Sequence, residues 1–167
     1  GNGAGHTVKG GIGSGDVNNR ENISIYEGLK AVGVPLTSES WIEDYEKRYM
    51  TARFQWRDKI LEDAKKVENP FDAYADNPFV LPQGRDIEPE DWRGAAAAVY
   101  VISRISGEGK DRTAQEGDYR LSEQEREDLR RLDAAELPVI LLINAGGPVE
   151  LTDLMEQMHH LAAILQI

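Results

Sequence analysis

The strongest constraint on the fold is a set of uninterrupted apolar runs, each about as long as a buried strand. Strands are predicted at residues 97–103, 138–144 and 162–167, and helices are predicted between them at 122–132 and 151–159. Strands that are apolar on both faces are typical of parallel sheets covered by helices on both sides. The sequence therefore predicts an α/β fold, with a mostly parallel sheet sandwiched between helices.

The first half of the chain is predicted to be largely helical after a glycine-rich start. The periodicity predicts a helix over 24–31 and a longer helix over 38–67, opened by a capping box of Ser40 and Glu43. Residues 69–89 are rich in Pro, Asp and Asn and are expected to be irregular. All the predicted strands therefore lie in the second half of the chain.

Composition limits the possible classes of function. The 167 residues are 40% hydrophobic and 29% charged, which is typical of one soluble globular domain. A net charge of -11 argues against a nucleic-acid partner and against docking on anionic membranes. It is compatible with a neutral or cationic small substrate, and equally with a plain solubility role.

The sequence gives little indication of a metal site or of a catalytic thiol. The chain has no cysteine, which excludes disulfides, thiolate catalysis and Cys-based zinc sites. Its three histidines, His6, His159 and His160, lack metal-ligand spacing. We therefore expect no metal and no cofactor. A chain without cysteine fits either side of a membrane, so the compartment is left open.

Both ends of the chain are typical of the interior of a longer polypeptide. The chain starts without Met, at Gly1, and ends within the apolar stretch 161–167. A glycine-rich start of this kind normally follows a strand, and the apolar end is typical of a strand in progress. We therefore expect residues 1–167 to form a partial sandwich domain that lacks its first strand and its final elements.

A carboxylate between two glycines marks the candidate catalytic position. Glu108 lies between Gly107 and Gly109, at the start of the polar loop that follows the strand at 97–103. α/β proteins place chemistry on loops beyond the carboxyl ends of buried strands, and small neighbours let a substrate approach the backbone. A carboxylic acid that donates a proton needs a raised pKa, which a poorly solvated site closed by another domain could supply.

Two charged residues that follow Glu108 have competing interpretations. For Arg112 and Asp118 the favoured interpretation is a network of local ion pairs that holds the loop. Arg112 is also a candidate neighbour of the substrate. The aromatic residues of the long predicted helix are likewise interpreted as a packed helix face in preference to a sugar platform; they are Trp41, Tyr45, Tyr49, Phe54 and Trp56.

The glycine-rich segment near the start is a second candidate binding element. Its densest part is Gly10-Gly11-Ile12-Gly13-Ser14-Gly15-Asp16. It lacks the Gly-x-x-x-x-Gly-Lys-Ser/Thr pattern, and Asp16 would repel a phosphate, so nucleotide binding is disfavoured. A tight connection without a ligand and a loop for a neutral ligand are the remaining alternatives. For the latter, Ser14 is the chosen contact because its side chain can both donate and accept a hydrogen bond.

Together these motifs resemble the second domain of family 3 glycoside hydrolases, which include the β-glucosidases. The resemblance extends in order and spacing over nearly the whole chain. It is carried by residues 10–16, by Ser106-Gly107-Glu108-Gly109 with Asp111-Arg112, by Gly117-Asp118 with Leu121, and by residues 139–149. The Ser-Gly-Glu-Gly motif combined with the Gly-Ser-Gly loop is fairly specific, whereas either alone would be weak.

The resemblance implies a six-stranded α/β sandwich whose loops complete an active site on a neighbouring (β/α)8 barrel. In this family the anomeric configuration is retained: an Asp on the barrel attacks the sugar, and a Glu from the sandwich acts as general acid and then base. By motif, Glu108 takes the acid/base position. Ser14 falls where the family's glycine loop reaches the non-reducing sugar, and Gly13 and Arg112 complete the predicted substrate-binding residues.

The function implied is that of one part of a retaining, exo-acting β-glycosidase that hydrolyses terminal β-D-glycosyl residues. Its expected partners are β-linked glucosides or oligosaccharides and the barrel domain of the same parent protein. The barrel and its nucleophile are not in this sequence, so the chain alone is expected to be inactive. The alternative is a non-catalytic carbohydrate-binding or interaction domain with the same fold.

Overall fold

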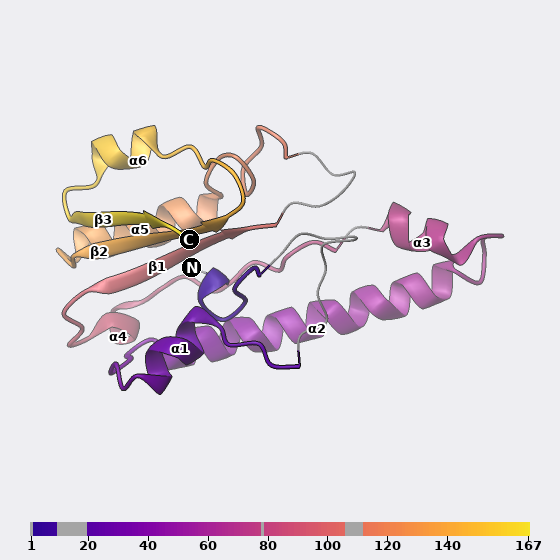
Figure 1. Ribbon diagram of the computed structural model, residues 1–167, viewed down its shortest axis with the longest axis horizontal. Helices are drawn as coiled ribbons and strands as arrows, with labels where there is room; N and C mark the ends of the chain where they lie inside the picture. The colour runs from indigo at the N-terminus through magenta and orange to yellow at the C-terminus, as the bar shows by residue number, and fades with distance from the viewer. Residues whose placement is uncertain (1, 10–19, 78, 106–111) are drawn as a thin grey trace. The chain divides into compact units, whose positions relative to one another are not determined.

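A computed structural model describes residues 2–9, 20–77, 79–105 and 112–167 (Figure 1). The chain divides into two compact units, which are considered separately. The first consists of Gly1–Ile42 with Asp86–Ile167, and the second is Glu43–Arg85. All three strands belong to the first unit.

The first unit is built on a parallel sheet. Strands β1 (Ala98–Arg104), β2 (Val139–Ala145) and β3 (Leu161–Gln166) lie in the order β1-β2-β3. Helix α5 (Glu123–Ala134) connects β1 to β2, and α6 (Thr152–Gln157) connects β2 to β3. The predicted α/β class and parallel sheet are confirmed, and each predicted strand is displaced by only one residue.

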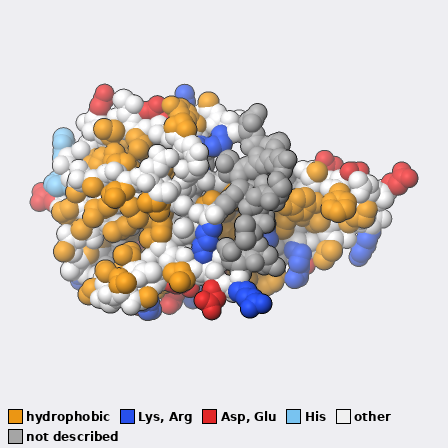
Figure 2. All heavy atoms as spheres, viewed as in Figure 1, with side chains coloured by type: hydrophobic (Ala, Val, Ile, Leu, Met, Phe, Trp, Pro, Cys, Tyr) orange, Lys and Arg blue, Asp and Glu red, His pale blue; other side chains and the backbone are white. Residues whose placement is uncertain are grey.

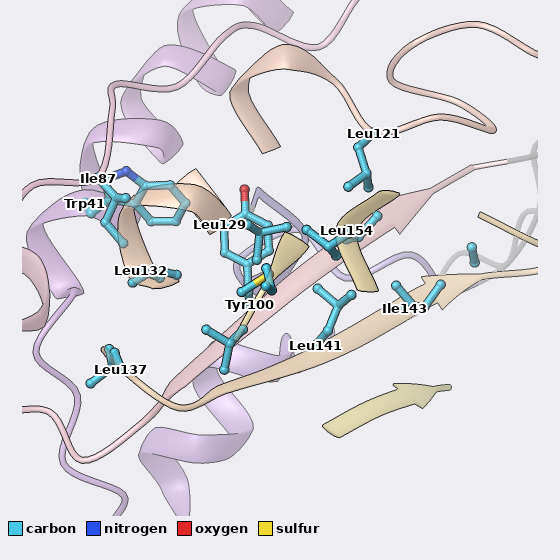
Figure 3. Packing of buried hydrophobic residues seen from close by; sticks show 14 residues of the cluster. Trp41, Ile87, Tyr100, Leu121, Leu129, Leu132, Leu137, Leu141, Ile143 and Leu154 are labelled. Carbon is cyan, nitrogen blue, oxygen red and sulfur yellow. The ribbon is translucent and has the colours of Figure 1, made fainter. Parts of the chain in front are cut away.

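One face of the sheet carries the main hydrophobic core. Because side chains alternate along a strand, every second residue of the paired strands β1 and β2 points to the same face. Buried residues of this face and of α5 and α6 form one cluster that includes Tyr100, Ile102, Leu129, Leu132, Leu141, Ile143 and Leu154 (Figure 3). Full burial of a leucine or isoleucine side chain is worth about 1.5–3 kcal/mol, so this cluster ties both helices to the sheet.

The opposite face of the sheet is covered near β1 by the short 3-10 helix η1 (Asn2–Ala4). A Cβ atom built on Gly3 would lie 2.0 Å from Ser103 Oγ and 2.9 Å from Val101 Cγ1. Only glycine allows the backbone to approach β1 this closely. Elsewhere this face is more open: Figure 2 shows hydrophobic side chains gathered over the sheet, and Val99 and Leu165 are 39% and 46% exposed.

Serine capping boxes begin two helices of the first unit. At α1 (Ile25–Ala31) the Ser24 hydroxyl accepts a hydrogen bond from the Glu27 amide, and the Glu27 carboxylate accepts one from the Ser24 amide. Ser122 and Glu125 make the same pair of bonds at the start of α5. The capping box predicted at Ser122 is therefore confirmed.

Two local predictions in the first half of the chain are wrong. Helix α2 (Glu39–Asp63) begins before Ser40, whose hydroxyl lies 3.4 Å from the Asp91 carboxylate instead of capping the helix. The segment predicted to be irregular contains a helix, α3 (Pro70–Asp76), capped by the Asn69 side chain. Asn and Pro are typical of loops, but they are equally typical of the cap and first position of a helix. A further short helix, α4, spans Pro89–Trp92.

The second unit holds an aromatic cluster between α2 and α3. The Trp56 ring meets those of Tyr74 and Phe79 edge-on, with centroids 5.7 Å and 5.6 Å away, and the Arg53 guanidinium lies 4.5 Å from the Trp56 centroid. The packed-face interpretation therefore holds for Trp56. It does not hold for Phe54, which is 49% exposed.

A buried carboxylate lies beside the main core. Asp128 of α5 is 1% exposed and accepts hydrogen bonds from the Tyr100 hydroxyl at 2.9 Å and the Gln124 amide at 3.0 Å. Desolvation raises the pKa of Asp128 and outweighs these hydrogen bonds, which lower it. The folded protein therefore holds the Asp128 proton more tightly than the unfolded chain does.

Replacing Asp128 with asparagine is expected to remove a pH-dependent part of the stability. A raised folded-state pKa means that the free energy of unfolding falls as the pH rises from about 4, the ordinary carboxyl value, through the folded-state pKa. The difference in unfolding free energy between Asp128→Asn and wild type should therefore shift in favour of the variant as the pH rises from about 4 through the folded-state pKa of Asp128. Urea unfolding at a series of pH values measures this trend.

Asp133, also on α5, offers a control of opposite sign. Desolvation raises its pKa, but hydrogen bonds from the His160 amide and ring outweigh it and leave the pKa below its ordinary value. Because its pKa is lowered, Asp133→Asn should lose stability relative to wild type as the pH rises through the folded-state pKa of Asp133 towards about 4, and the difference should level off above that pH. Identical pH trends for the two variants would contradict the assignment.

Candidate functional site

Three of the four predicted site residues, Glu108, Ser14 and Gly13, lie outside the described residues. Arg112 is described, and so are the segments that flank the other three. The described residues of these flanks lie at the carboxyl ends of β1 and β2. The two strands are paired along their whole length, from Ala98 opposite Val139 to Arg104 opposite Ala145. The carboxyl edge of a parallel sheet is where α/β proteins bind their ligands.

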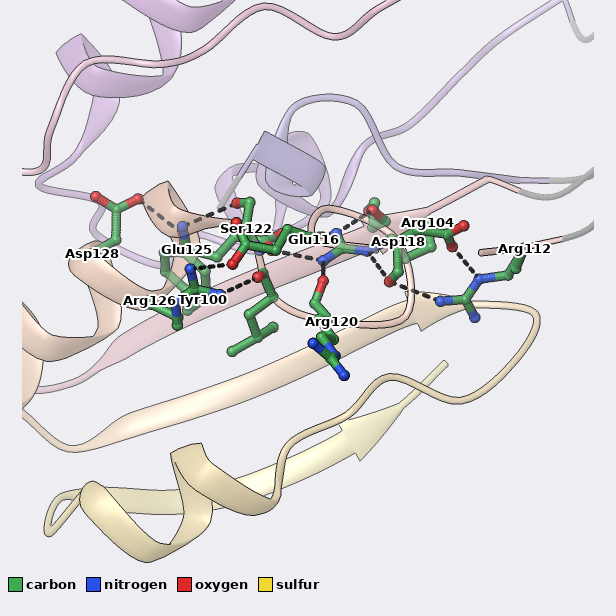
Figure 4. A network of polar contacts seen from close by, with 12 residues as sticks. Tyr100, Arg104, Arg112, Glu116, Asp118, Arg120, Ser122, Glu125, Arg126 and Asp128 are labelled. Atoms are coloured by element: carbon green, nitrogen blue, oxygen red, sulfur yellow. Dashed lines mark hydrogen bonds and ion pairs between the residues drawn. The ribbon is translucent and has the colours of Figure 1, made fainter. Parts of the chain in front are cut away.

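Both flanks of residues 106–111 bind the same residue. Arg104, the last residue of β1, donates from Nε to the Asp118 carbonyl oxygen at 2.7 Å. Arg112 donates to that same oxygen from Nη2 at 2.9 Å (Figure 4). The two arginines that flank the segment carrying Glu108 are therefore bound to one residue of the turn that precedes α5.

Arg112 also forms an ion pair with the Asp118 side chain. Its Nε lies 2.6 Å from Asp118 Oδ1, and its Nη1 donates to the Pro148 carbonyl at 2.8 Å. The second Asp118 oxygen accepts hydrogen bonds from the Thr113 amide and hydroxyl. Desolvation raises the pKa of Asp118, but these partners outweigh it and hold the pKa below its usual value. The predicted ion-pair network of Arg112 and Asp118 is confirmed.

The end of β1 is joined to α5 by a buried ion pair. Arg104 approaches Glu125 with both terminal nitrogens, at 2.8 Å and 2.6 Å, and the two side chains are only 7% and 12% exposed. Bidentate pairs of this kind fix the orientation of both side chains. Sequence analysis missed Arg104. The available signal was a charged residue that comes two residues after a buried apolar run.

A second anchor holds the flanks of the glycine-rich segment 10–19. Asn144, near the end of β2, accepts hydrogen bonds from the Val8 amide at 2.6 Å and the Ser103 hydroxyl at 2.9 Å, and donates to the Val8 carbonyl at 2.9 Å. On the other side, the Ile25 amide donates to the Thr7 hydroxyl at 2.9 Å. Residues 7–8 are thus bound both to β2 and to the start of α1. Asn144 and Thr7 were also missed by sequence analysis, because nothing in their local sequence points to these partners.

Apart from these contacts, the described residues show few features that indicate a particular kind of site. Within 2–9, 20–77, 79–105 and 112–167, no three His, Asp or Glu side chains are grouped so that they could hold a metal ion. In the same residues, no helix is both long enough and apolar enough to cross a membrane. The features that stand out are the two anchored segments at the carboxyl edge of the sheet.

The chain matches one protein family over its whole length. The model of the glycosyl hydrolase family 3 C-terminal domain covers residues 1–167. A comparison with curated proteins found no match.

Solved structures of two β-glucosidases are similar to the chain. For β-glucosidase 3B from Thermotoga neapolitana in complex with glucose, the sequence identity is 31% and the TM-score 0.64, over 93% of this chain and 21% of that protein. For a β-glucosidase from Paenibacillus barengoltzii, the identity is 26% and the TM-score 0.59, over 94% of this chain and 16% of that protein. The chain thus spans only about a fifth of the length of these relatives.

The sequence motifs, the parallel α/β sheet and these matches all indicate the same family. The chain belongs to the C-terminal domain family of the family 3 glycosyl hydrolases.

Proposed function

We propose that this chain is the part of a retaining β-glucosidase-like hydrolase that supplies the general acid/base, and that Glu108 has that role. The observation that carries the proposal is the position of the motif Ser106-Gly107-Glu108-Gly109. It begins two residues after β1 ends, and its described flanks are both bound to Asp118 at the carboxyl edge of the sheet. This is the edge at which α/β proteins carry out their chemistry.

In the proposed reaction the Glu108 carboxylic acid donates its proton to the glycosidic oxygen while a carboxylate of a partner domain attacks the anomeric carbon. The Glu108 carboxylate then accepts a proton from the water that releases the sugar, so that the configuration is retained. Ser14 and Gly13 are proposed to contact the terminal sugar, and Arg112 to border the same site. The substrates proposed are β-linked glucosides or oligosaccharides.

The proposal requires a second domain. Because the chain spans only 21% and 16% of the two β-glucosidases, we propose that a (β/α)8 barrel with the nucleophilic Asp belongs to the same parent protein. The chain by itself is then inactive, since it holds only one of the two carboxylates that the reaction needs.

Glu108→Gln in the parent protein tests the proposal. Glucosides with poor leaving groups should lose about 10²–10⁴-fold in kcat/KM, the usual contribution of a general acid. Aryl glucosides with good leaving groups need little protonation and should lose much less. Added azide should restore turnover with these substrates, because azide attacks the glycosyl enzyme without a general base, and the product should be the β-glycosyl azide.

The matched control is Glu116→Gln, the same substitution at an exposed carboxylate whose partner is Arg126 at 2.7 Å. This variant should keep the wild-type ratio of rates for poor and good leaving groups. Equal losses for both kinds of substrate in Glu108→Gln, together with no response to azide, would exclude Glu108 as the acid/base. In that case the non-catalytic carbohydrate-binding alternative would be the better explanation.

A further inference from the structure

Asp118 is bound by two described arginines, Arg104 before residues 106–111 and Arg112 directly after them. The backbone carbonyl of this residue accepts hydrogen bonds from both Arg104 and Arg112, at 2.7 Å and 2.9 Å, while its carboxylate pairs with Arg112 at 2.6 Å (Figure 4). We call these three residues the Asp118 clasp. One side of the clasp is the last residue of β1, and the other is the first described residue after the segment that carries Glu108.

Each arginine of the clasp is itself fixed by a separate part of the first unit. Arg104 is held by the bidentate pair with Glu125 of α5. Arg112 donates to the carbonyl of Pro148, in the connection between β2 and α6, and a Cβ atom added to Gly147 would lie 3.1 Å from its Nη1. The clasp therefore joins the segment to α5 and to the end of β2, and does not simply close a local turn.

The Arg112 side of the clasp requires a carboxylate at position 118, whereas the carbonyl that accepts from Arg104 is present in any residue. One carboxylate oxygen accepts the Arg112 Nε–H and the other accepts the Thr113 amide and hydroxyl. An asparagine side chain has one acceptor oxygen and one NH₂ donor, so one of these donors would face another donor. The side chain is 26% exposed and that of Arg112 is 17% exposed, so water can replace these bonds only in part.

We propose that Asp118 is a positioning residue for the acid/base segment. The inference rests on the proposed function of Glu108. In this proposal Asp118 binds both flanking arginines and thereby restricts the position of the Glu108 carboxyl group relative to the glycosidic oxygen. In this role Asp118 acts through the segment that carries Glu108 and is not itself a catalytic group. A misplacement of about 1 Å in a catalytic group can cost about 10²-fold in rate, so loss of the clasp should be visible in catalysis.

Asp118→Ala and Asp118→Asn in the parent protein test this role through dependence on the leaving group. Relative to wild type, Asp118→Ala should lower kcat/KM for an alkyl β-glucoside about 10²-fold. For a dinitrophenyl β-glucoside the fold loss in kcat/KM should be smaller by a factor of about ten or more, because that leaving group needs little proton transfer. The asparagine variant keeps the shape of the side chain and should show the same trend in weaker form. If the alanine variant does not fold, the same rates are measured with the asparagine variant.

The control is Glu116→Ala, which removes another arginine-paired carboxylate from the same turn. Glu116 binds Arg126 and neither arginine of the clasp. A purely structural role for Asp118 would reduce the amount of active protein, and so would lower the rates with both glucosides equally. Such equal losses in Asp118→Ala, alongside a leaving-group effect in Glu108→Gln, would overturn the clasp proposal and leave the proposed function standing.

Amide hydrogen exchange gives a second readout that does not depend on Glu108. In Asp118→Ala, peptides covering residues 105–113 should exchange faster than in wild type, while peptides from β2 should be unchanged. If Glu108→Gln shows no leaving-group effect, the proposed function fails, and exchange alone decides whether the clasp holds the segment. Unchanged exchange over 105–113 would overturn the clasp in either case.

Discussion

Arg104→Met is expected to lower the free energy of unfolding by about 3–5 kcal/mol, the usual cost of removing one partner from a buried ion pair. The variant leaves the Glu125 carboxylate, only 12% exposed, without the guanidinium that lies 2.6 Å away in the wild type. It also removes one of the two arginine donors to the Asp118 carbonyl. Urea unfolding curves of the two proteins, followed by circular dichroism, measure the difference.

Two controls separate the buried ion pair from a general effect of charge. In Arg104→Met/Glu125→Leu the remaining charge is also removed, so stability should recover apart from about 1 kcal/mol for the lost capping box at Ser122. The exposed pair of Arg126 and Glu116 should matter far less, and Glu116→Ala should cost about 1 kcal/mol or less. A similar cost for Arg104→Met and Glu116→Ala would show that burial does not strengthen the Arg104 pair.

Leu141→Ala is expected to destabilise the chain by about 2–5 kcal/mol, through lost burial and the cavity left behind. Leu141 is fully buried in the central strand β2, where it pairs with Tyr100 of β1 and Ile164 of β3. It belongs to the core cluster that also holds residues of α5 and α6, and in a close-packed core the surrounding side chains have little freedom to fill the space. The measurement is again urea unfolding, here of the 167-residue chain.

The matched control for this prediction is Leu165→Ala, the same substitution on β3. Leu165 is 46% exposed, so its truncation leaves no closed cavity and should cost less than about 1 kcal/mol. Comparable losses in the two variants would mean that the core is not centred on β2.

Local patterns in the sequence predicted most of the secondary structure. The run Val139-Ile140-Leu141-Leu142-Ile143 is apolar on both faces, and it forms the central strand β2. The Ser122 capping box places a polar group where the first amides of α5 need one. The prediction failed at α3, because Asn69-Pro70 suits a loop and a helix start equally well, and only packing with the rest of the second unit distinguishes the two.

The candidate site was predictable to a smaller extent. Glu108, Gly13 and Ser14 were singled out by short motifs, and their roles stay predictions because they lie outside the described residues. Arg112 and Asp118 are six residues apart, so their pairing was within reach of sequence reasoning. Asn144 was out of reach: its partner Val8 is 136 residues away, and no local pattern connects the two.

By itself, the sequence determined the fold class, the order of the strands along the chain and the family motifs. Each of these depends on residues that are close in sequence, through side-chain periodicity, helix capping and motif spacing. Only the tertiary structure decided that Arg104 and Arg112 converge on Asp118 and that Asn144 binds Val8. The physical reason is that these bonds join residues that no local pattern connects, 14 apart for Arg104 and Asp118 and 136 apart for Asn144 and Val8, so they form only once folding brings the residues together.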